Sequence, residues 1–442
     1  MGEPMARAVQ ACVHCGFCLA VCPTYQELGQ EMDSPRGRIV LMKQVLEGSL
    51  LPAEAQPHID RCLGCLACEP ACPSGVPYRD LISPYRAKLA AGAERTAGEK
   101  LRRWLAAATI PYPGRFRLAL RGAALGRALG GLVPPVLRPM LELAPPEVPP
   151  SVALPRISPA QGERRARVAL LAGCAQQVLD PDINVATIEV LTRNGVEVVV
   201  PAGQGCCGGL AWHTGDAAAA RDFARRNLEA FPADVDAIVT NAAGCGSTMH
   251  EYHLILRGTA EEARAKEFAR RVVDVSVYLA RLGLREKPVG WRTPVIVAYH
   301  DACHLANAQG VRAEPRNLLR AIPGLELREV ANAHLCCGSA GTYNLDQPEI
   351  ARSLGAQKAA AVSAALANGS HLRQGFGGQA GQALATGAGQ TPATGPASGA
   401  GIVASGNIGC LTQLRSHLAQ ATSPIRVRHT LQVLRDAYRG DG

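Results

Sequence analysis

Apolar residues in the second half of the chain come in short runs, and each run ends shortly before a cysteine. These runs are RVALLAG before Cys174, AIVTNAAG before Cys245, PVIVAYHDA before Cys303 and GIVASGNIG before Cys410. Short apolar runs bounded by glycine or polar residues are typical of strands buried in a parallel sheet. The pattern therefore predicts alternating strands and helices, with cysteines at the carboxyl ends of strands, where open α/β sheets gather ligands.

The same half of the chain repeats itself. Its two cysteine series are Cys174, Cys206, Cys207, Cys245 and Cys303, Cys336, Cys337, Cys410. The first cysteine and the pair are separated by 31 residues in one copy and 32 in the other, but the pair and the last cysteine by 37 and 72. The excess falls on residues 366–400, an almost uncharged stretch rich in Gly, Ala, Gln and Thr, which we expect to be a disordered insertion. We predict two repeated α/β domains, at residues 166–290 and 291–442.

The first half of the chain has a different pattern. In SPRGRIVLMKQVLEG, residues 34–48, the apolar positions fall on one helix face, so residues 1–85 are predicted to form a helical domain. Residues 86–165 are predicted to form a basic, Pro/Arg-rich helical linker. Its part from Arg86 to Arg138 holds eleven Lys or Arg against Glu94 and Glu99. Residues 86–140 therefore suit contact with an anionic membrane or an acidic partner, although a solvated linker is the simpler interpretation.

Composition narrows the class of protein. The overall prediction is an α/β fold with an N-terminal helical domain. No apolar run approaches the ~18 residues that a membrane-spanning helix needs. Sixteen clustered cysteines without a signal peptide indicate a reducing compartment, so we expect a cytoplasmic protein or one bound peripherally to the cytoplasmic face of the inner membrane. The basic stretch has few aromatic residues to stack on bases, which argues against a nucleic-acid partner.

Two further cysteine series lie in the N-terminal domain, and each matches C-x2-C-x2-C-x3-C-P. This is the bacterial ferredoxin spacing for [4Fe-4S] clusters, in which the fourth cysteine of each motif ligates the other cluster. The predicted ligands of cluster 1 are Cys12, Cys15, Cys18 and Cys72, and those of cluster 2 are Cys62, Cys65, Cys68 and Cys22. Zinc is the alternative, but zinc sites usually take two separated ligand pairs.

The eight cysteines of the repeated domains do not reveal whether these domains bind a metal or which one. Four thiols per copy suffice for one further cubane cluster or for zinc, and a metal-free domain is a third interpretation. The second copy also carries His300 and His304 beside Cys303, and His334 before the cysteine pair. Such imidazoles can ligate metal, hydrogen-bond a cluster or relay protons to a quinone, although a lone histidine is most often structural.

Together these motifs resemble the CCG-domain family of redox subunits, in which a cysteine, a Cys-Cys-Gly triplet and a closing Cys-x-x-Cys recur. The family includes heterodisulfide reductase and the iron-sulfur subunits of several 2-hydroxy acid and glycerol-3-phosphate dehydrogenases. The resemblance is strongest to the iron-sulfur subunits of glycolate oxidases. The segments that carry it are CVHCGFCLAVCPTYQELGQEMDSPRGRI, NAAGCGSTMHEY, CCGSAGTYNL and SGNIGCLTQL. The chain departs from heterodisulfide reductases at Thr248 and Gln413, which stand where each closing motif has its second thiol.

The resemblance implies an electron-transfer subunit of an oxidoreductase complex. It would take electrons from flavin-binding subunits that oxidise glycolate to glyoxylate, and pass them towards a quinone or another membrane acceptor. Alternatives are the equivalent subunit of a glycerol-3-phosphate or D-lactate dehydrogenase, a heterodisulfide-reductase-like subunit, or a zinc-stabilised binding module. The chain itself shows no catalytic constellation, so substrate oxidation is expected on the partner subunits.

The crossed ligand assignment can be tested by mutagenesis. Cys18→Ser is expected to damage cluster 1 and Cys22→Ser cluster 2, although both residues belong to one motif, because the fourth thiol reaches the other cluster. Iron analysis and electron paramagnetic resonance of anaerobically purified protein, before and after dithionite, measure the two clusters. Loss of the cluster 1 signal in Cys22→Ser would contradict the assignment.

Overall fold

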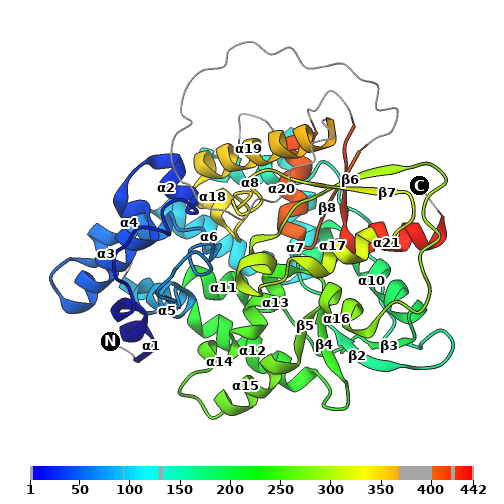
Figure 1. The fold of residues 1–442 in the computed structure, drawn as a ribbon. Coiled ribbons are helices and arrows are strands. Elements are labelled where there is room, and N and C mark those ends of the chain that lie inside the picture. The colour runs from blue at the N-terminus through cyan, green and yellow to red at the C-terminus, as the bar shows by residue number, and fades with distance from the viewer. Residues whose placement is uncertain (1–2, 93, 129–132, 368–400, 420–423, 441–442) are drawn as a thin grey trace.

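The computed structural model describes residues 3–92, 94–128, 133–367, 401–419 and 424–440 (Figure 1). A helical N-terminal unit is followed by a helical linker and by two α/β units, each built on its own sheet. The predicted fold class is therefore confirmed.

Five helices form the N-terminal unit: α1 (Glu3–Gln10), α2 (Pro23–Leu28), α3 (Pro35–Glu47), α4 (Pro52–Asp60) and α5 (Arg79–Leu89). Helix α3 is the helix predicted within residues 34–48. It begins where the Ser34 side chain accepts a hydrogen bond from a backbone N–H of the first turn, and it ends at Gly48, whose φ is 80°. Met42 of α3 packs against Leu81 and Ile82 of α5 in the core of this unit.

The linker folds against the first α/β unit. Its helices are α6 (Ala97–Thr109), α7 (Pro113–Ala128) and α8 (Arg138–Leu143), and Leu120 of α7 is buried with Val178 of α9 (Gln176–Leu179). The predicted boundaries at 86 and 165 differ from the observed elements, because α5 continues to Leu89 and the two-residue strand β1 (Ile157–Ser158) already belongs to the first sheet. A strand this short has no alternation that a sequence pattern can reveal.

The two sheets share one topology. The first has the order β1-β3-β2-β4-β5 and the second β7-β6-β8-β9, and all neighbours are parallel except β1 and β3. The strands are β2 (Ala166–Leu170), β3 (Val196–Val199), β4 (Ala237–Thr240), β5 (Val272–Asp274), β6 (Val295–Tyr299), β7 (Leu325–Glu329), β8 (Ile402–Ser405) and β9 (Arg426–His429). The orders β3-β2-β4-β5 and β7-β6-β8-β9 correspond strand by strand, so the repeat includes a fourth strand that the cysteine spacing did not reveal.

The two α/β units pack through equivalent helices. The helices of the first unit that matter here are α10 (Asp182–Arg193), α12 (Ala217–Ala230), α13 (Ala243–His250) and α16 (Val275–Leu282), and those of the second are α17 (Ala313–Arg320), α19 (Pro348–Ala367), α20 (Ile408–Leu418) and α21 (Thr430–Arg439). Helix α10 packs on α21, and α16 packs on α17. Each pair joins a helix between the first two strands of the repeat in one unit to the last helix of the other unit, which gives one shared apolar core.

The predicted insertion at residues 366–400 lies outside the described residues from residue 368 onward. Its first two residues belong to α19, and Leu366 is buried there, so the helix continues past the predicted start of the insertion. Among the described residues, we find no helix with the length and apolar character needed to cross a membrane.

A close backbone contact holds the N-terminal unit on the first α/β unit. Gly215, with φ +90°, follows α11 (Gly209–Thr214), and a Cβ added there would lie 2.7 Å from the carbonyl oxygen of Arg86 and 3.0 Å from Cβ of Ala90. A side chain at this position must therefore push α11 and α5 apart.

Gly215→Ala is expected to destabilise the protein by more than Gly258→Ala. Both glycines have positive φ, at +90° and +71°, which costs an alanine about 1–2 kcal/mol. Only Gly215 also meets backbone, which adds roughly 1–3 kcal/mol of overpacking, whereas Gly258 has nothing within 4 Å. Thermal midpoints of the two variants measure the difference, and equal midpoints would show that this contact does not hold the units together.

Candidate metal centres

The thiols predicted for cluster 1 line one cavity at the edge of the N-terminal unit. They are Cys12, Cys15, Cys18 and Cys72, joined at the wall by Cys68. Cys15 is exposed. The loop turns at Gly16, with φ +88°, where a Cβ would lie 2.9 Å from a guanidinium nitrogen of Arg36. Burial raises the pKa of the Cys18 thiol to about 11, so this thiol needs a cation, such as the iron of a cluster, to ionise.

The thiols predicted for cluster 2 line a second, deeper cavity. Cys22, Cys62, Cys65 and Cys68 all lie on its wall. The backbone N–H of Gly64 donates to the sulfur of Cys62 at 3.4 Å. Burial raises the pKa of Cys65 and Cys68. Burial also opposes ionisation of Cys62, but the charges of Arg38 and Arg86 outweigh it and lower the pKa of that thiol.

Both cavities bring together thiols of the two motifs, and the crossed assignment stays a prediction. Each cavity holds three thiols of one motif and the fourth thiol of the other, and Cys68 lies between the two. Sulfur is the ligand that iron-sulfur clusters require, and four thiols around one cavity suit a cubane cluster. The residues present therefore fit two [4Fe-4S] clusters, which would exchange single electrons when bound.

Arg38 is a buried charge beside the thiols of the second cavity that the sequence reasoning missed. Its side chain is 1% exposed, although it sits on α3 beside the apolar positions that predicted the helix. A guanidinium nitrogen lies 3.9 Å from the sulfur of Cys22, and another lies 3.6 Å from a carboxylate oxygen of the buried Asp33. A buried arginine needs negative partners, so Arg38 offers a fixed positive charge to the thiolates of cluster 2. The available signal was a charged residue on an otherwise apolar helix face.

In the first α/β unit, the four predicted thiols come together. Cys174 follows β2, Cys206 and Cys207 follow β3, and Cys245 opens α13 after β4. The sulfurs of Cys174 and Cys206 are 3.4 Å apart. The pKa of Cys207 is lowered because the thiols of Cys206 and Cys245 donate to its sulfur and outweigh burial, and the N–H of Gly209 donates to it at 3.4 Å.

The second α/β unit gathers its thiols in the same way. The sulfurs of Cys303 and Cys336 are 3.9 Å apart, and hydrogen bonds from Cys336 and Cys410 lower the pKa of Cys337. A π-helix, His304–Ala308, begins directly after Cys303. This rare element is frequent at functional sites.

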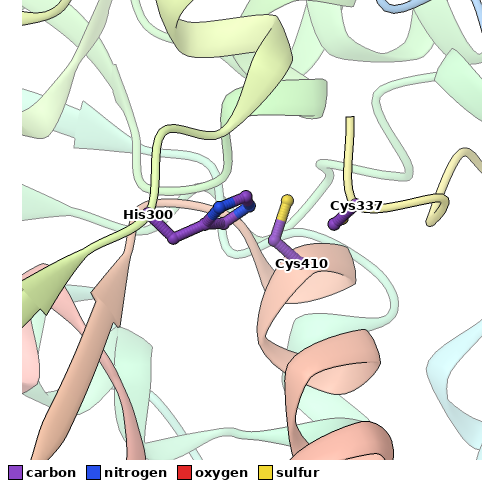
Figure 2. A group of neighbouring side chains, drawn as sticks. All are labelled: His300, Cys337 and Cys410. Carbon is purple, nitrogen blue, oxygen red and sulfur yellow. The ribbon is translucent and has the colours of Figure 1, made fainter. Parts of the chain in front are cut away.

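The second unit adds an imidazole to its thiols. His300 at the end of β6, Cys337 and Cys410 place one ligand atom each within 4.8 Å of one another, and Figure 2 shows the His300 ring directed towards the two cysteines. His300 is 1% exposed, and neither ring nitrogen meets hydrogen-bond geometry with a described residue, although the nearby ring helps to lower the pKa of the Cys337 thiol. The residue three positions before Cys174 in the first unit is Leu171, so the two copies offer different donor sets.

The other two histidines lie apart from this trio. Nδ1 of His304 is 3.5 Å from the sulfur of Cys303, whereas its Nε2 has no partner among the described residues. His334 is half-buried, and burial together with the charges of Lys358 and Arg312 lowers its pKa. It is not among the side chains that could share one metal ion with Cys337.

The cluster 2 cavity lies against the cysteines of the second α/β unit, which the sequence did not predict. Cys65, Cys303 and Cys336 belong to one buried cluster. The amide of Asn307 donates to the carbonyl oxygen of Cys65 at 3.2 Å, and the hydroxyl of Tyr343 donates to that of Arg61 at 2.9 Å. Two cysteine sites far apart in the sequence are thereby held next to each other.

His300→Leu tests whether this imidazole is a ligand. In the metal-free protein, leucine removes two unpaired buried nitrogens, so we expect the free energy of unfolding to stay equal or rise by about 1–3 kcal/mol. In the metal-loaded protein the same change removes a donor, so the metal of the second α/β unit should be lost more readily to a chelator.

Metal analysis and denaturant unfolding of both forms make the comparison, with the half-buried His334→Leu as the control. Unchanged metal retention in His300→Leu would show that His300 does not ligate.

Comparisons with known proteins agree with these cysteine groups. The chain matches the family model described as a 4Fe-4S dicluster domain over residues 8–76, and the model described as a cysteine-rich domain over residues 168–250 and 297–368. It is 28% identical over 269 residues to lactate utilization protein A of Geobacillus thermodenitrificans (strain NG80-2), covering 61% of this chain and 98% of that protein.

Two relatives are more similar over most of their length. The chain is 39% identical over 372 residues to the probable glycolate oxidase iron-sulfur subunit of Bacillus subtilis (strain 168), covering 80% of this chain and 84% of that one. It is 40% identical over 354 residues to the glycolate oxidase iron-sulfur subunit of Escherichia coli (strain K12), covering 78% and 83%. With this identity over 80% and 78% of its length, the chain belongs to the family of glycolate oxidase iron-sulfur subunits.

Proposed function

We propose that this chain carries electrons from a flavoprotein partner, which oxidises glycolate to glyoxylate, towards a quinone-type acceptor. The proposal rests on the family to which the chain belongs, whose named members are iron-sulfur subunits of glycolate oxidases. Glycolate as the substrate and the flavin-binding subunits as partners come from this relationship.

The observation that carries the proposal is the continuity of the thiol sites. The cavity of Cys12, Cys15 and Cys18 shares Cys68 with the cavity of Cys62 and Cys65. The second cavity in turn adjoins Cys303 through one buried cluster. A series of adjoining redox sites that begins at the surface and ends in the interior suits a carrier better than a single catalytic centre.

The outer end of this series offers a place for a partner. Val13 and Phe17, on either side of the exposed Cys15, are each 66% exposed. Large apolar side chains at the surface are typical of contact sites between proteins. A flavoprotein docked on this loop would place its electron donor beside cluster 1.

The linker suits peripheral contact with an anionic membrane. Exposed apolar residues on its helices lie among many basic residues, and they include Leu101, Trp104, Leu118 and Leu125. This combination is typical of helices that lie in the membrane interface. This surface supports a peripheral position of the chain on the membrane, where quinones are dissolved.

A second substrate is favoured by one specific observation. The match to lactate utilization protein A covers 98% of that protein, so lactate is the alternative donor for the complex. Heterodisulfide reduction has less support, because the residues that replace the second thiols, Thr248 and Gln413, make hydrogen bonds to the backbone. Thr248 donates to the carbonyl oxygen of Gly244 at 2.9 Å, and Gln413 donates to that of Ala351 at 3.0 Å.

The proposal predicts both metal content and activity. The isolated chain, purified anaerobically, is expected to hold at least about eight irons and about eight acid-labile sulfides, the content of two cubane clusters. The complete complex is expected to reduce a redox dye with glycolate, and the same preparation given D-lactate or glycerol 3-phosphate serves as the control for substrate. Normal glycolate oxidation in a strain that lacks this chain, or zinc without sulfide, would refute the proposal.

A further inference from the structure

A pocket lies where the N-terminal unit, the linker and both α/β units meet. Its wall includes Cys62 and Tyr85 from the N-terminal unit, Arg103 from α6, His213 from α11 and His304 from the π-helix. The cavity itself has a volume of about 100 Å³ and opens to the surface at its mouth. Pockets that bind small organic molecules commonly lie between domains.

Four buried polar atoms on the wall of this pocket have no hydrogen-bond partner among the residues that the structure describes. They are Oη of Tyr85, Nε of Arg103, Nε2 of His213 and Nε2 of His304. Tyr85 is 2% exposed. Each unpaired buried group costs about 1–3 kcal/mol. Four of them around one pocket indicate a ligand that hydrogen-bonds to them.

The charges around the pocket favour a neutral ligand. Arg95 lies 2.9 Å from a carboxylate oxygen of Asp60, and Arg103 lies 3.0 Å from one of Asp346. Arg86 donates to backbone carbonyl oxygens. Most of the positive charge is thus already paired, and an anion would find only the Nε N–H of Arg103 as a charged donor.

The rest of the wall is apolar and aromatic. Leu63, Leu89, Leu210 and the ring of Tyr343 line it beside the polar groups. Burial and the neighbouring positive charges lower the pKa of His213 to about 3, so its ring is neutral at neutral pH. A flat apolar ring that carries carbonyl oxygens as acceptors fits this combination.

The pocket also lies between two thiol sites. Cys62 of cluster 2 is part of its wall. His304 has Nδ1 at 3.5 Å from the sulfur of Cys303 and its unpaired Nε2 on the side of the pocket. The rings of His213 and His304 are 5.6 Å apart. A ligand here would contact a redox site on each side and two imidazoles.

We propose that this pocket binds the head group of a quinone, with Tyr85 and the imidazoles of His213 and His304 hydrogen-bonding to its carbonyl oxygens. The inference rests on the proposed function, to which it adds the site of the acceptor. Glycolate releases two electrons and two protons when it becomes glyoxylate, and a quinone takes up two of each when it becomes a hydroquinone. Arg103 of α6 lines the pocket, while its neighbour Trp104 is 64% exposed, so one helix joins the pocket to the surface assigned to the membrane.

Binding of decylubiquinone to the full chain with its clusters, measured by calorimetry under anaerobic conditions, tests the proposal. Tyr85→Phe removes one hydrogen bond of about 1 kcal/mol and should raise the Kd about fivefold. Leu210→Trp fills the pocket and should raise the Kd more than about tenfold, since a bulky ring displaces the ligand. Tyr278→Phe, at a half-buried tyrosine outside the pocket, is the matched control and should leave the Kd unchanged.

Iron content equal to that of the wild type shows that each variant has folded. Equal Kd values in the wild type, Tyr85→Phe and Leu210→Trp would overturn the inference, as would binding of a small disulfide such as cystamine in place of decylubiquinone. Glycolate-dependent dye reduction by the wild-type complex distinguishes a failure of this inference from a failure of the proposed function. If dye reduction persists while the pocket variants bind quinone normally, only the pocket assignment is wrong. If the wild type shows no dye reduction but Tyr85→Phe weakens quinone binding, only the proposed electron source is wrong.

Discussion

The structure depends on holding groups of thiols close together in a protein interior. Buried thiolates repel one another strongly because the local dielectric constant is low, and burial raises the pKa of Cys65 and Cys68 accordingly. The chain compensates with backbone N–H groups directed at sulfur, as at Gly64 and Gly209, and with the buried charge of Arg38. Bound metal completes this compensation, because it binds the deprotonated thiol.

The same constraint explains how the N-terminal unit docks. The second α/β unit covers the cluster 2 cavity and shields its thiols from water. Asn307 and Tyr343 of that unit donate to the backbone carbonyl oxygens of Cys65 and Arg61. On the outer side, Ser353 of α19 donates to the carboxylate of Glu27 at 2.7 Å, and α2 lies beside α19 (Figure 1). The contacts that shield the thiols thus also bring two thiol sites side by side.

The repeat conserves the fold but not the chemistry of its sites. Both units have the same strand order and the same placement of four cysteines. One unit has Leu171 where the other has the unpartnered imidazole of His300. The sheet tolerates this exchange because both side chains are buried at the end of a strand. A change of residue there alters the metal-ligand donors without altering the pairing of the strands. A duplicated fold can in this way hold two different centres.

The sequence by itself determined the fold class, three strands of each repeat and the grouping of the thiols. Local spacing suffices for this, because C-x2-C-x2-C-x3-C dictates which thiols share a loop, and short apolar runs before cysteines dictate strands that deliver them to one sheet edge. The helix at residues 34–48 likewise followed from its periodicity. What only the tertiary structure decided are relations between distant segments: Cys65 beside Cys303, Arg38 turned inward to Cys22, and Tyr85, His213 and His304 around one pocket. These relations depend on the packing of helical and α/β units whose contact surfaces have no period in the sequence, so only the folded chain brings their chemistry together.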